Sequence, residues 1–173
     1  ASMIVLLALV LRVLYVLTAQ VDFPIVGDVK QYVLYAWNLV HRGVFSTALP
    51  QAATAIPDSY RGPGYPMWLA TMMQLAGHSD LPLRPVPNGL HALGYVSDTW
   101  MRYTLASQVV LGTATVVLTI MTARLWLDRA LALCAGALVA LWPHLITFTG
   151  VLLSETLFGF LLLLSIWLAC HAE

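Results

Sequence analysis

Four apolar runs, each close to the length that crosses a membrane, dominate the sequence. They cover residues 3–19, 104–126, 130–149 and 151–170. A membrane-spanning helix needs about 20 predominantly apolar residues. Arg12 lies inside the first run and Pro143 inside the third, and the residues around them stay apolar. The pattern predicts an all-α membrane protein, a multi-spanning helical bundle with about four spans in one transmembrane domain, residues 1–173.

The composition supports a membrane location. Only 9% of the residues are charged and the mean hydropathy is +0.83. A soluble domain carries about 25% charged residues, which it needs to cover its surface. The formal net charge is zero, so nothing indicates nucleic-acid binding. We therefore expect membrane lipids around this chain.

A longer segment of mixed polarity, residues 20–103, separates the first two runs. A connection of this length without a role of its own is uncommon, so we expect it to be the functional region. Residues 29–40 and 65–76 are predicted helices. The second is too short to span and suits a helix lying in the membrane interface. Tyr60 and Tyr65 suit the headgroup level.

The charges near the ends of the runs predict an orientation. Arg124 and Arg129 lie in the short connection between the second and third runs, and short arginine-rich loops tend to be cytoplasmic. Residues 20–103 are then the first extracytoplasmic loop. We expect a multi-pass protein of a bacterial inner membrane, with this loop facing the periplasm.

Asp28 has two interpretations. It follows Gly27 at the start of a predicted helix, where an aspartate accepts hydrogen bonds as an N-cap, worth about 1 kcal/mol. It is also a carboxylate close to the membrane, where it could take a proton from an acceptor hydroxyl. Both interpretations stay open from the residues alone.

Arg61 lies in residues 59–66, which read SYRGPGYP. The simple interpretation is a surface turn set by proline and glycine. In the functional one, Gly62 and Gly64 let the backbone approach closely, and the guanidinium binds a phosphate through two hydrogen bonds. Pro66 suits the first helical position of the following helix, whose N-terminus favours an anion.

Glu155 follows Ser154 at the outer end of the fourth run. A carboxylate at the edge of a membrane segment usually has a partner or a function, and His144 is the candidate partner. The two side chains leave a divalent metal open, although the ligand set is incomplete. No cofactor is certain from the residues.

The order of three motifs resembles the N-terminal part of membrane glycosyltransferases of the GT-C fold, in the branch of protein O-mannosyltransferases and aminoarabinose transferases. After the first run the chain reads GDVKQYVLYAWNLVHRGVFS, then RGPGYPMWLA, then LWPHLITFTGVLLSETLFGFLLLLSIWL. The resemblance implies an enzyme that moves a sugar from a polyprenyl-phosphate carrier to an extracytoplasmic acceptor, with inversion. It implies that residues 1–173 are the N-terminal part of a larger transmembrane domain.

The resemblance also implies roles for single residues. Asp28 corresponds to the aspartate that acts as base or positions the acceptor. Arg61, with Lys30, is expected at the carrier phosphate. Substrate contacts are expected from Tyr32, Tyr60, Tyr65, His144 and Glu155. Many relatives carry a second acid after the first aspartate, where this chain has Val29, and this difference weakens a metal site there.

Two other functions stay open. A non-catalytic membrane scaffold or subunit would keep the same fold without the chemistry, and Val29 favours it. A transporter of lipids or solutes usually places broken helices and polar groups at the middle of the membrane. Here the polar residues gather in one outer loop, which argues against transport.

Overall fold

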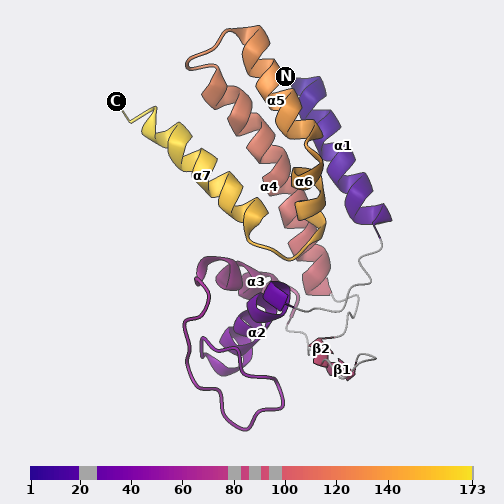
Figure 1. Cartoon of the computed structure of the whole chain (residues 1–173), viewed down its shortest axis with the longest axis vertical. Coiled ribbons are helices and arrows are strands. Elements are labelled where there is room, and N and C mark those ends of the chain that lie inside the picture. The colour runs from indigo at the N-terminus through magenta and orange to yellow at the C-terminus, as the bar shows by residue number, and fades with distance from the viewer. Residues whose placement is uncertain (20–26, 78–82, 86–90, 94–98, 173) are drawn as a thin grey trace. The chain divides into compact units, whose positions relative to one another are not determined.

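The computed structural model of the chain describes residues 1–19, 27–77, 83–85, 91–93 and 99–172 (Figure 1). Two compact units make up the chain. Unit 1 contains Ala1–Gln20 and Leu105–Glu173, and unit 2 contains Val21–Thr104. Unit 2 therefore coincides closely with the predicted extracytoplasmic loop 20–103, of which residues 20–26, 78–82, 86–90 and 94–98 lie outside the described residues.

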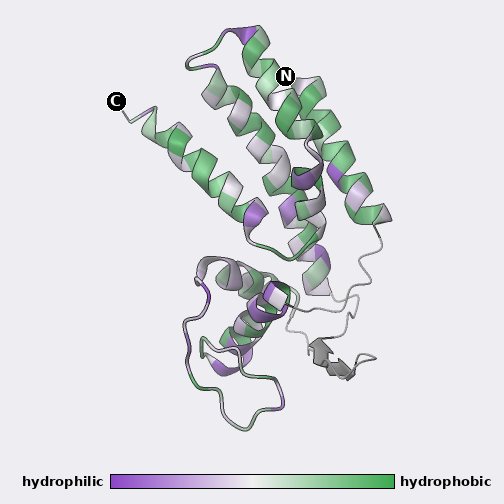
Figure 2. Cartoon of the chain, viewed as in Figure 1, coloured by the Kyte–Doolittle hydropathy of each residue, from purple (hydrophilic) through white to green (hydrophobic). Residues whose placement is uncertain are grey.

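Unit 1 is built from the four apolar runs. Its elements are α1 (Ser2–Thr18), most of α4 (Thr99–Ala123), α5 (Arg129–Leu141), α6 (Pro143–Thr147), the 3-10 turn η1 (Phe148–Gly150) and α7 (Glu155–Ala169). In Figure 1, α1, α4 and α5 run side by side, while α7 diverges from them and contacts η1. Hydrophobic residues cover these helices along their length (Figure 2).

One described helix, α4, is long and apolar enough to cross a membrane, with 25 residues. The pair formed by α5 and the α6–η1 stretch, bent by 56° at its break, would be a second span if it crosses as one unit. The helices α1 and α7 are apolar but shorter, at 17 and 15 residues. The helical class is thus confirmed, and the number of spans stays a prediction.

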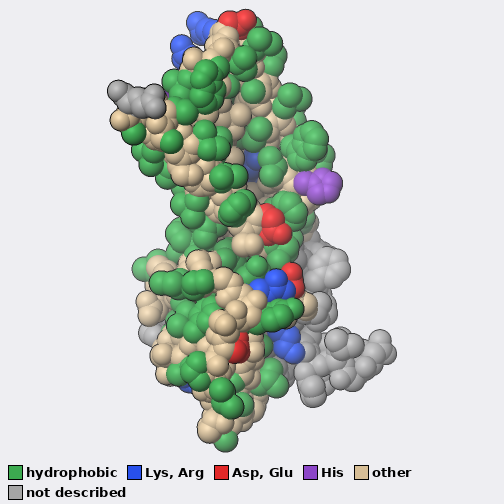
Figure 3. All heavy atoms as spheres, turned by 60° about the vertical axis from the view of Figure 1, so that its left-hand side comes forward, with side chains coloured by type: hydrophobic (Ala, Val, Ile, Leu, Met, Phe, Trp, Pro, Cys, Tyr) green, Lys and Arg blue, Asp and Glu red, His purple; other side chains and the backbone are tan. Residues whose placement is uncertain are grey.

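The face of unit 1 seen in Figure 3 is largely apolar. In Figure 3, hydrophobic side chains cover most of the face shown, and charged side chains gather at the turn between α4 and α5. That turn carries Arg124, Asp128 and Arg129. Asp128 caps α5 by accepting from the backbone N–H of Leu131 at 2.9 Å, as an N-cap aspartate does.

Small residues let the helices of unit 1 pack closely. The core contains Ala8 of α1, Val116 and Ile120 of α4, and Ala140 of α5. A Cβ placed on Gly136 of α5 would come within 2.7 Å of the Ile120 Cδ1, so only glycine fits this contact without movement of the isoleucine.

Arg12 bonds to the carbonyls beside the break at Pro143. Proline has no N–H, so the carbonyl of Val139, four residues earlier, loses its helical donor. Arg12 Nη2 donates to that carbonyl at 3.4 Å, and Nη1 donates to the carbonyls of Ala140 at 3.4 Å and Ala8 at 3.1 Å. Arg12 is 1% exposed. The inward-facing arginine of the first run and the proline of the third are therefore parts of one arrangement.

Gln108 of α4 donates hydrogen bonds to carbonyls of the next irregular stretch, residues 149–151. This fully buried side chain donates through Nε2 to the carbonyls of Thr149 at 3.0 Å and Val151 at 2.9 Å. A buried carbonyl without a donor costs about 1–3 kcal/mol. Arg12 and Gln108 together donate hydrogen bonds to carbonyls of the bent α5–η1 region and so lower the free-energy cost of its irregular backbone.

Unit 2 is a pair of packed helices, α2 (Gly27–Arg42) and α3 (Gly64–Leu75), with the antiparallel strands β1 (Leu83–Pro85) and β2 (His91–Leu93). The strands depart from the all-α prediction, although they form only a three-residue ladder with Leu83 opposite Leu93. Both predicted helices of the loop are present, and each begins one or two residues before the predicted position.

The connection between α2 and α3, residues 43–63, is tied to α2 by hydrogen bonds. Asn38 Nδ2 donates to the carbonyls of Ser46 at 2.9 Å and Ala48 at 2.8 Å. Arg42 Nη2 donates to those of Pro50 at 2.7 Å and Ala52 at 3.0 Å. Although this segment has no regular structure, its course is set by side chains of the helix before it.

Candidate functional site

Asp28 and Arg61 meet in unit 2. Arg61 Nη2 donates to Asp28 Oδ1 in an ion pair, and Arg61 Nε donates to Gln31 Oε1 at 2.6 Å. The Arg61 side chain is 24% exposed and that of Asp28 is 56% exposed. Asp28 lies in the first turn of α2, which begins at Gly27. Because α2 begins at Gly27, Asp28 is a residue of the helix and not its N-cap, and its carboxylate binds the arginine instead.

Two tyrosines extend the site around the guanidinium. The Arg61 Cζ lies 5.6 Å from the ring centre of Tyr32 and 5.2 Å from that of Tyr60. These distances are within the range of a cation–π interaction. Tyr32 also packs edge-on against Tyr65 of α3, with ring centres 5.2 Å apart. Three tyrosines predicted to bind substrate thus surround or adjoin Arg61.

The glycines of the SYRGPGYP stretch have ordinary backbone angles and open surroundings. Neither Gly62 nor Gly64 has a positive φ, and a Cβ at either position would meet nothing within 4 Å. No other described part of the chain lies close to these two glycines, and the approach of a ligand to their backbone stays a prediction. Pro66 is the third residue of α3, since the helix begins at Gly64, and so it is not at the first helical position.

Sequence reasoning missed three polar residues beside the pair. Gln31 bonds to Arg61 directly, while Tyr35 and Asp58 bond to each other and Tyr35 accepts from the backbone of Tyr60 at 3.0 Å. A signal existed for two of them. Asp28, Gln31, Tyr32 and Tyr35 follow the i, i+3, i+4, i+7 spacing that places side chains on one helix face. Lys30 is also on α2, in its first turn, and is half-buried.

His144 and Glu155 belong to unit 1, on α6 and at the start of α7. Within the described part of the chain, no hydrogen bond or ion pair joins them, so the expected partnership is wrong. The His144 ring instead lies near Phe148, with centres 6.3 Å apart.

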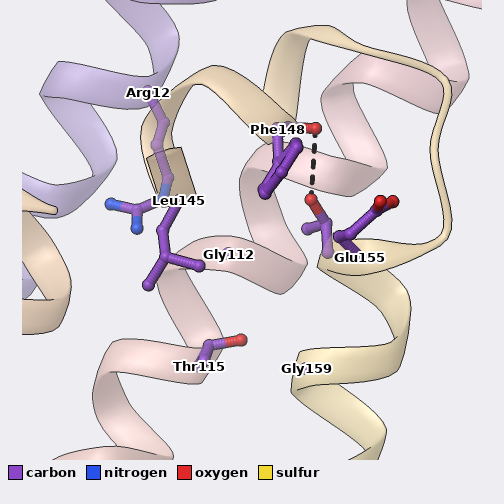
Figure 4. A pocket seen from close by; sticks show the side chains of 8 residues that line it. Arg12, Gly112, Thr115, Leu145, Phe148, Glu155 and Gly159 are labelled. Atoms are coloured by element: carbon purple, nitrogen blue, oxygen red, sulfur yellow. Dashed lines mark hydrogen bonds between the residues drawn. The ribbon is translucent and has the colours of Figure 1, made fainter. Parts of the chain in front are cut away.

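Glu155 lines a small pocket in unit 1 of about 30 Å³, together with Arg12, Gly112 and Thr115. Figure 4 shows Arg12 and Glu155 on opposite sides of it. The pocket has room for a few water molecules at most, because one water needs roughly 10–15 Å³. It is too small for a sugar.

Among the described residues, no group of three His, Cys, Asp or Glu side chains is placed to hold a metal ion. His144 and Glu155 do not come together, which removes the pair on which the metal was based. No family model, curated protein or solved structure matches this chain. The likeness to GT-C glycosyltransferases therefore stays a prediction that depends on the quoted motifs.

Proposed function

We propose that the chain is part of an inverting membrane glycosyltransferase that uses a polyprenyl-phosphate-linked sugar and an extracytoplasmic acceptor. The observation that carries this proposal is the meeting of Asp28 and Arg61 in unit 2, flanked by the rings of Tyr32 and Tyr60. An enzyme of this kind needs a cation for the leaving phosphate and a carboxylate for the nucleophile, close to each other.

The ion pair suggests how the two groups would be used. Arginine binds phosphate through two parallel hydrogen bonds, and a phosphate arriving at Arg61 would compete with the Asp28 carboxylate for Nη2. The released carboxylate would then be free to take the acceptor's proton. The donor would thus have to bind before Asp28 becomes active as a base.

In the transfer step, the acceptor oxygen forms a bond to the anomeric carbon from the side opposite the phosphate. The bond between that carbon and the phosphate oxygen breaks, and its electron pair leaves with the polyprenyl phosphate. The acceptor's proton goes to Asp28. One displacement inverts the anomeric configuration, and catalysis comes mainly from positioning and stabilisation of the leaving charge.

The test uses the full chain in lipid nanodiscs and two variants. Asp28→Asn should lower the turnover of a panel of radiolabelled polyprenyl-phosphate sugars by about 100-fold or more, the usual contribution of a general base. Arg61→Gln should weaken binding of farnesyl phosphate, a short carrier analogue, by about tenfold or more because the charge-assisted hydrogen bonds to the phosphate are lost. Farnesol, which lacks the phosphate, should bind both proteins equally.

The contrary result is equally clear. Normal turnover in Asp28→Asn, or unchanged farnesyl phosphate binding in Arg61→Gln, would remove the roles assigned to these residues.

The second candidate, a non-catalytic membrane subunit, is favoured by Val29 and by the mutual neutralisation of Asp28 and Arg61. It predicts no transfer with any donor in the panel while the fold stays intact.

A further inference from the structure

Asp58 is a second centre of hydrogen bonding in unit 2. Its Oδ1 accepts from the Tyr35 hydroxyl. Its Oδ2 accepts from the Thr47 backbone N–H at 2.9 Å and from the Thr47 hydroxyl at 2.8 Å. A half-buried carboxylate with several donors is strongly held, because hydrogen bonds to charged groups are about twice as strong as neutral ones.

This carboxylate acts on the residue before Arg61. The Tyr60 backbone N–H donates to the Tyr35 hydroxyl at 3.0 Å and also to Asp58 Oδ1 at 3.5 Å, and the Tyr35 hydroxyl donates in turn to Asp58. Tyr35 is fully buried and its ring stacks on Phe45, with centres 4.0 Å apart. The backbone of Tyr60, directly before Arg61, is therefore held by a hydrogen bond to a buried side chain of α2.

The same helix also holds the Arg61 side chain, through Asp28 and Gln31. Helix α2 thus holds this part of the chain at two places. Tyr35 binds the backbone of Tyr60, and Asp28 and Gln31 bind the Arg61 guanidinium. Glycine strain does not explain the position of Arg61, since Gly62 and Gly64 have ordinary φ values and open surroundings. Hydrogen bonds explain it instead: those of the guanidinium to Asp28 and Gln31, and those of the Tyr60 N–H to Tyr35 and Asp58.

We propose that Asp58 is a positioning residue for anion binding: acting through Tyr35 and Tyr60, it holds Arg61 where a phosphate group can be bound. The inference rests on the proposed function, in which Arg61 binds the carrier phosphate. Asp58 itself touches neither substrate nor the guanidinium, so its effect on binding passes entirely through the conformation of residues 60 and 61.

The experiment measures the affinity of farnesyl phosphate, with farnesol as the uncharged control, for variants of the full chain in nanodiscs. Asp58→Asn keeps the size of the side chain, but its amide cannot accept from both Thr47 donors and Tyr35. It should weaken farnesyl phosphate binding about fivefold to tenfold, comparable with the loss of one ordinary hydrogen bond. Farnesol binding should not change.

Ser46→Ala is the matched control for damage to the same segment. Ser46 is buried, and its hydroxyl donates to the Ile56 carbonyl at 2.7 Å and accepts from the Ala48 N–H at 3.1 Å. Among the described residues, no hydrogen bond joins this hydroxyl to Asp58 or Tyr60. This variant should lower the thermal unfolding midpoint but leave farnesyl phosphate affinity within twofold of the parent protein.

Tyr35→Phe keeps the ring on Phe45 and removes only the hydroxyl, so it should weaken farnesyl phosphate binding even if Asp58→Asn fails to fold.

A double-mutant cycle separates positioning from general stability. In an Arg61→Gln background, Asp58→Asn should have no further effect on farnesyl phosphate affinity, because the group it positions is absent. Additive losses, or unchanged affinity in both Asp58→Asn and Tyr35→Phe, would overturn the inference while leaving the proposed function standing. Unchanged affinity in Arg61→Gln alone would overturn the proposed function and, with it, this inference.

Discussion

Arg61 donates to the carboxylate of Asp28, 33 residues earlier in the chain. The two residues lie at the ends of different segments, one in the first turn of α2 and one just before α3. Their pairing creates a site with a carboxylate, a guanidinium and tyrosine rings at one place. Both side chains remain partly exposed, so an incoming anion can reach them.

The exposure of this pair predicts that it matters little for stability. Asp28→Asn should change the free energy of unfolding by less than about 1 kcal/mol, as for other exposed ion pairs. Asp58→Asn should cost more, about 1–3 kcal/mol, because several of its hydrogen-bond partners are less exposed and would lose an acceptor. Denaturant titration in detergent compares the two. An equal loss in both would make Asp28 a structural residue.

The tyrosine rings beside Arg61 should strengthen its binding of a phosphate group. Tyr60→Leu removes one ring from the guanidinium and should weaken farnesyl phosphate binding about twofold to fivefold, the value of an exposed cation–π contact. Tyr60→Phe keeps the ring and should bind like the parent protein. A loss in the phenylalanine variant as large as in the leucine variant would assign the effect to the hydroxyl instead.

Arg12 should be essential to unit 1 because of Pro143. Arg12→Met removes the donor from the buried carbonyl of Ala140 and from the half-buried carbonyl of Val139, and should destabilise the protein by about 2–4 kcal/mol. Pro143→Ala returns an N–H to the Val139 carbonyl, so the double variant should lose less stability than the sum of the single ones. Unfolding in detergent measures all three. Strict additivity would show that the two residues act independently.

Glycine should be required at position 136 but not at position 159. Gly136→Ala places a Cβ within 2.7 Å of the Ile120 Cδ1 and should destabilise the protein by about 1–3 kcal/mol through overpacking. Gly159→Ala, in α7, meets nothing within 4 Å and should be neutral or stabilising by up to about 1 kcal/mol, since alanine is the better helix former. A similar loss in both would exclude the packing explanation.

Much of the helical layout followed from apolar length and spacing. The four apolar runs became α1, α4, the broken α5–η1 stretch and α7, and the two helices of unit 2 were also predicted. The observed helix boundaries differ from the predicted ones where the helix extends beyond the apolar run or covers only part of it. Helix α4 begins at Thr99 rather than at 104, because Trp100 and Met101 of its first turn are buried and extend the helix before the apolar run. Helix α7 begins only at Glu155, because η1 and the residues after it take up the preceding stretch.

The sequence by itself determined which residue types had to be explained: an arginine and a proline inside apolar runs, and an acid and a base in a loop rich in proline. Only the tertiary structure decided their partners. It joined Arg12 to the carbonyls freed by Pro143, joined Asp28 to Arg61, separated His144 from Glu155, and revealed Gln31, Tyr35 and Asp58. The physical reason is that periodicity reports contacts within a helix turn, whereas a buried polar group is satisfied by whichever distant group the folded loop brings near it.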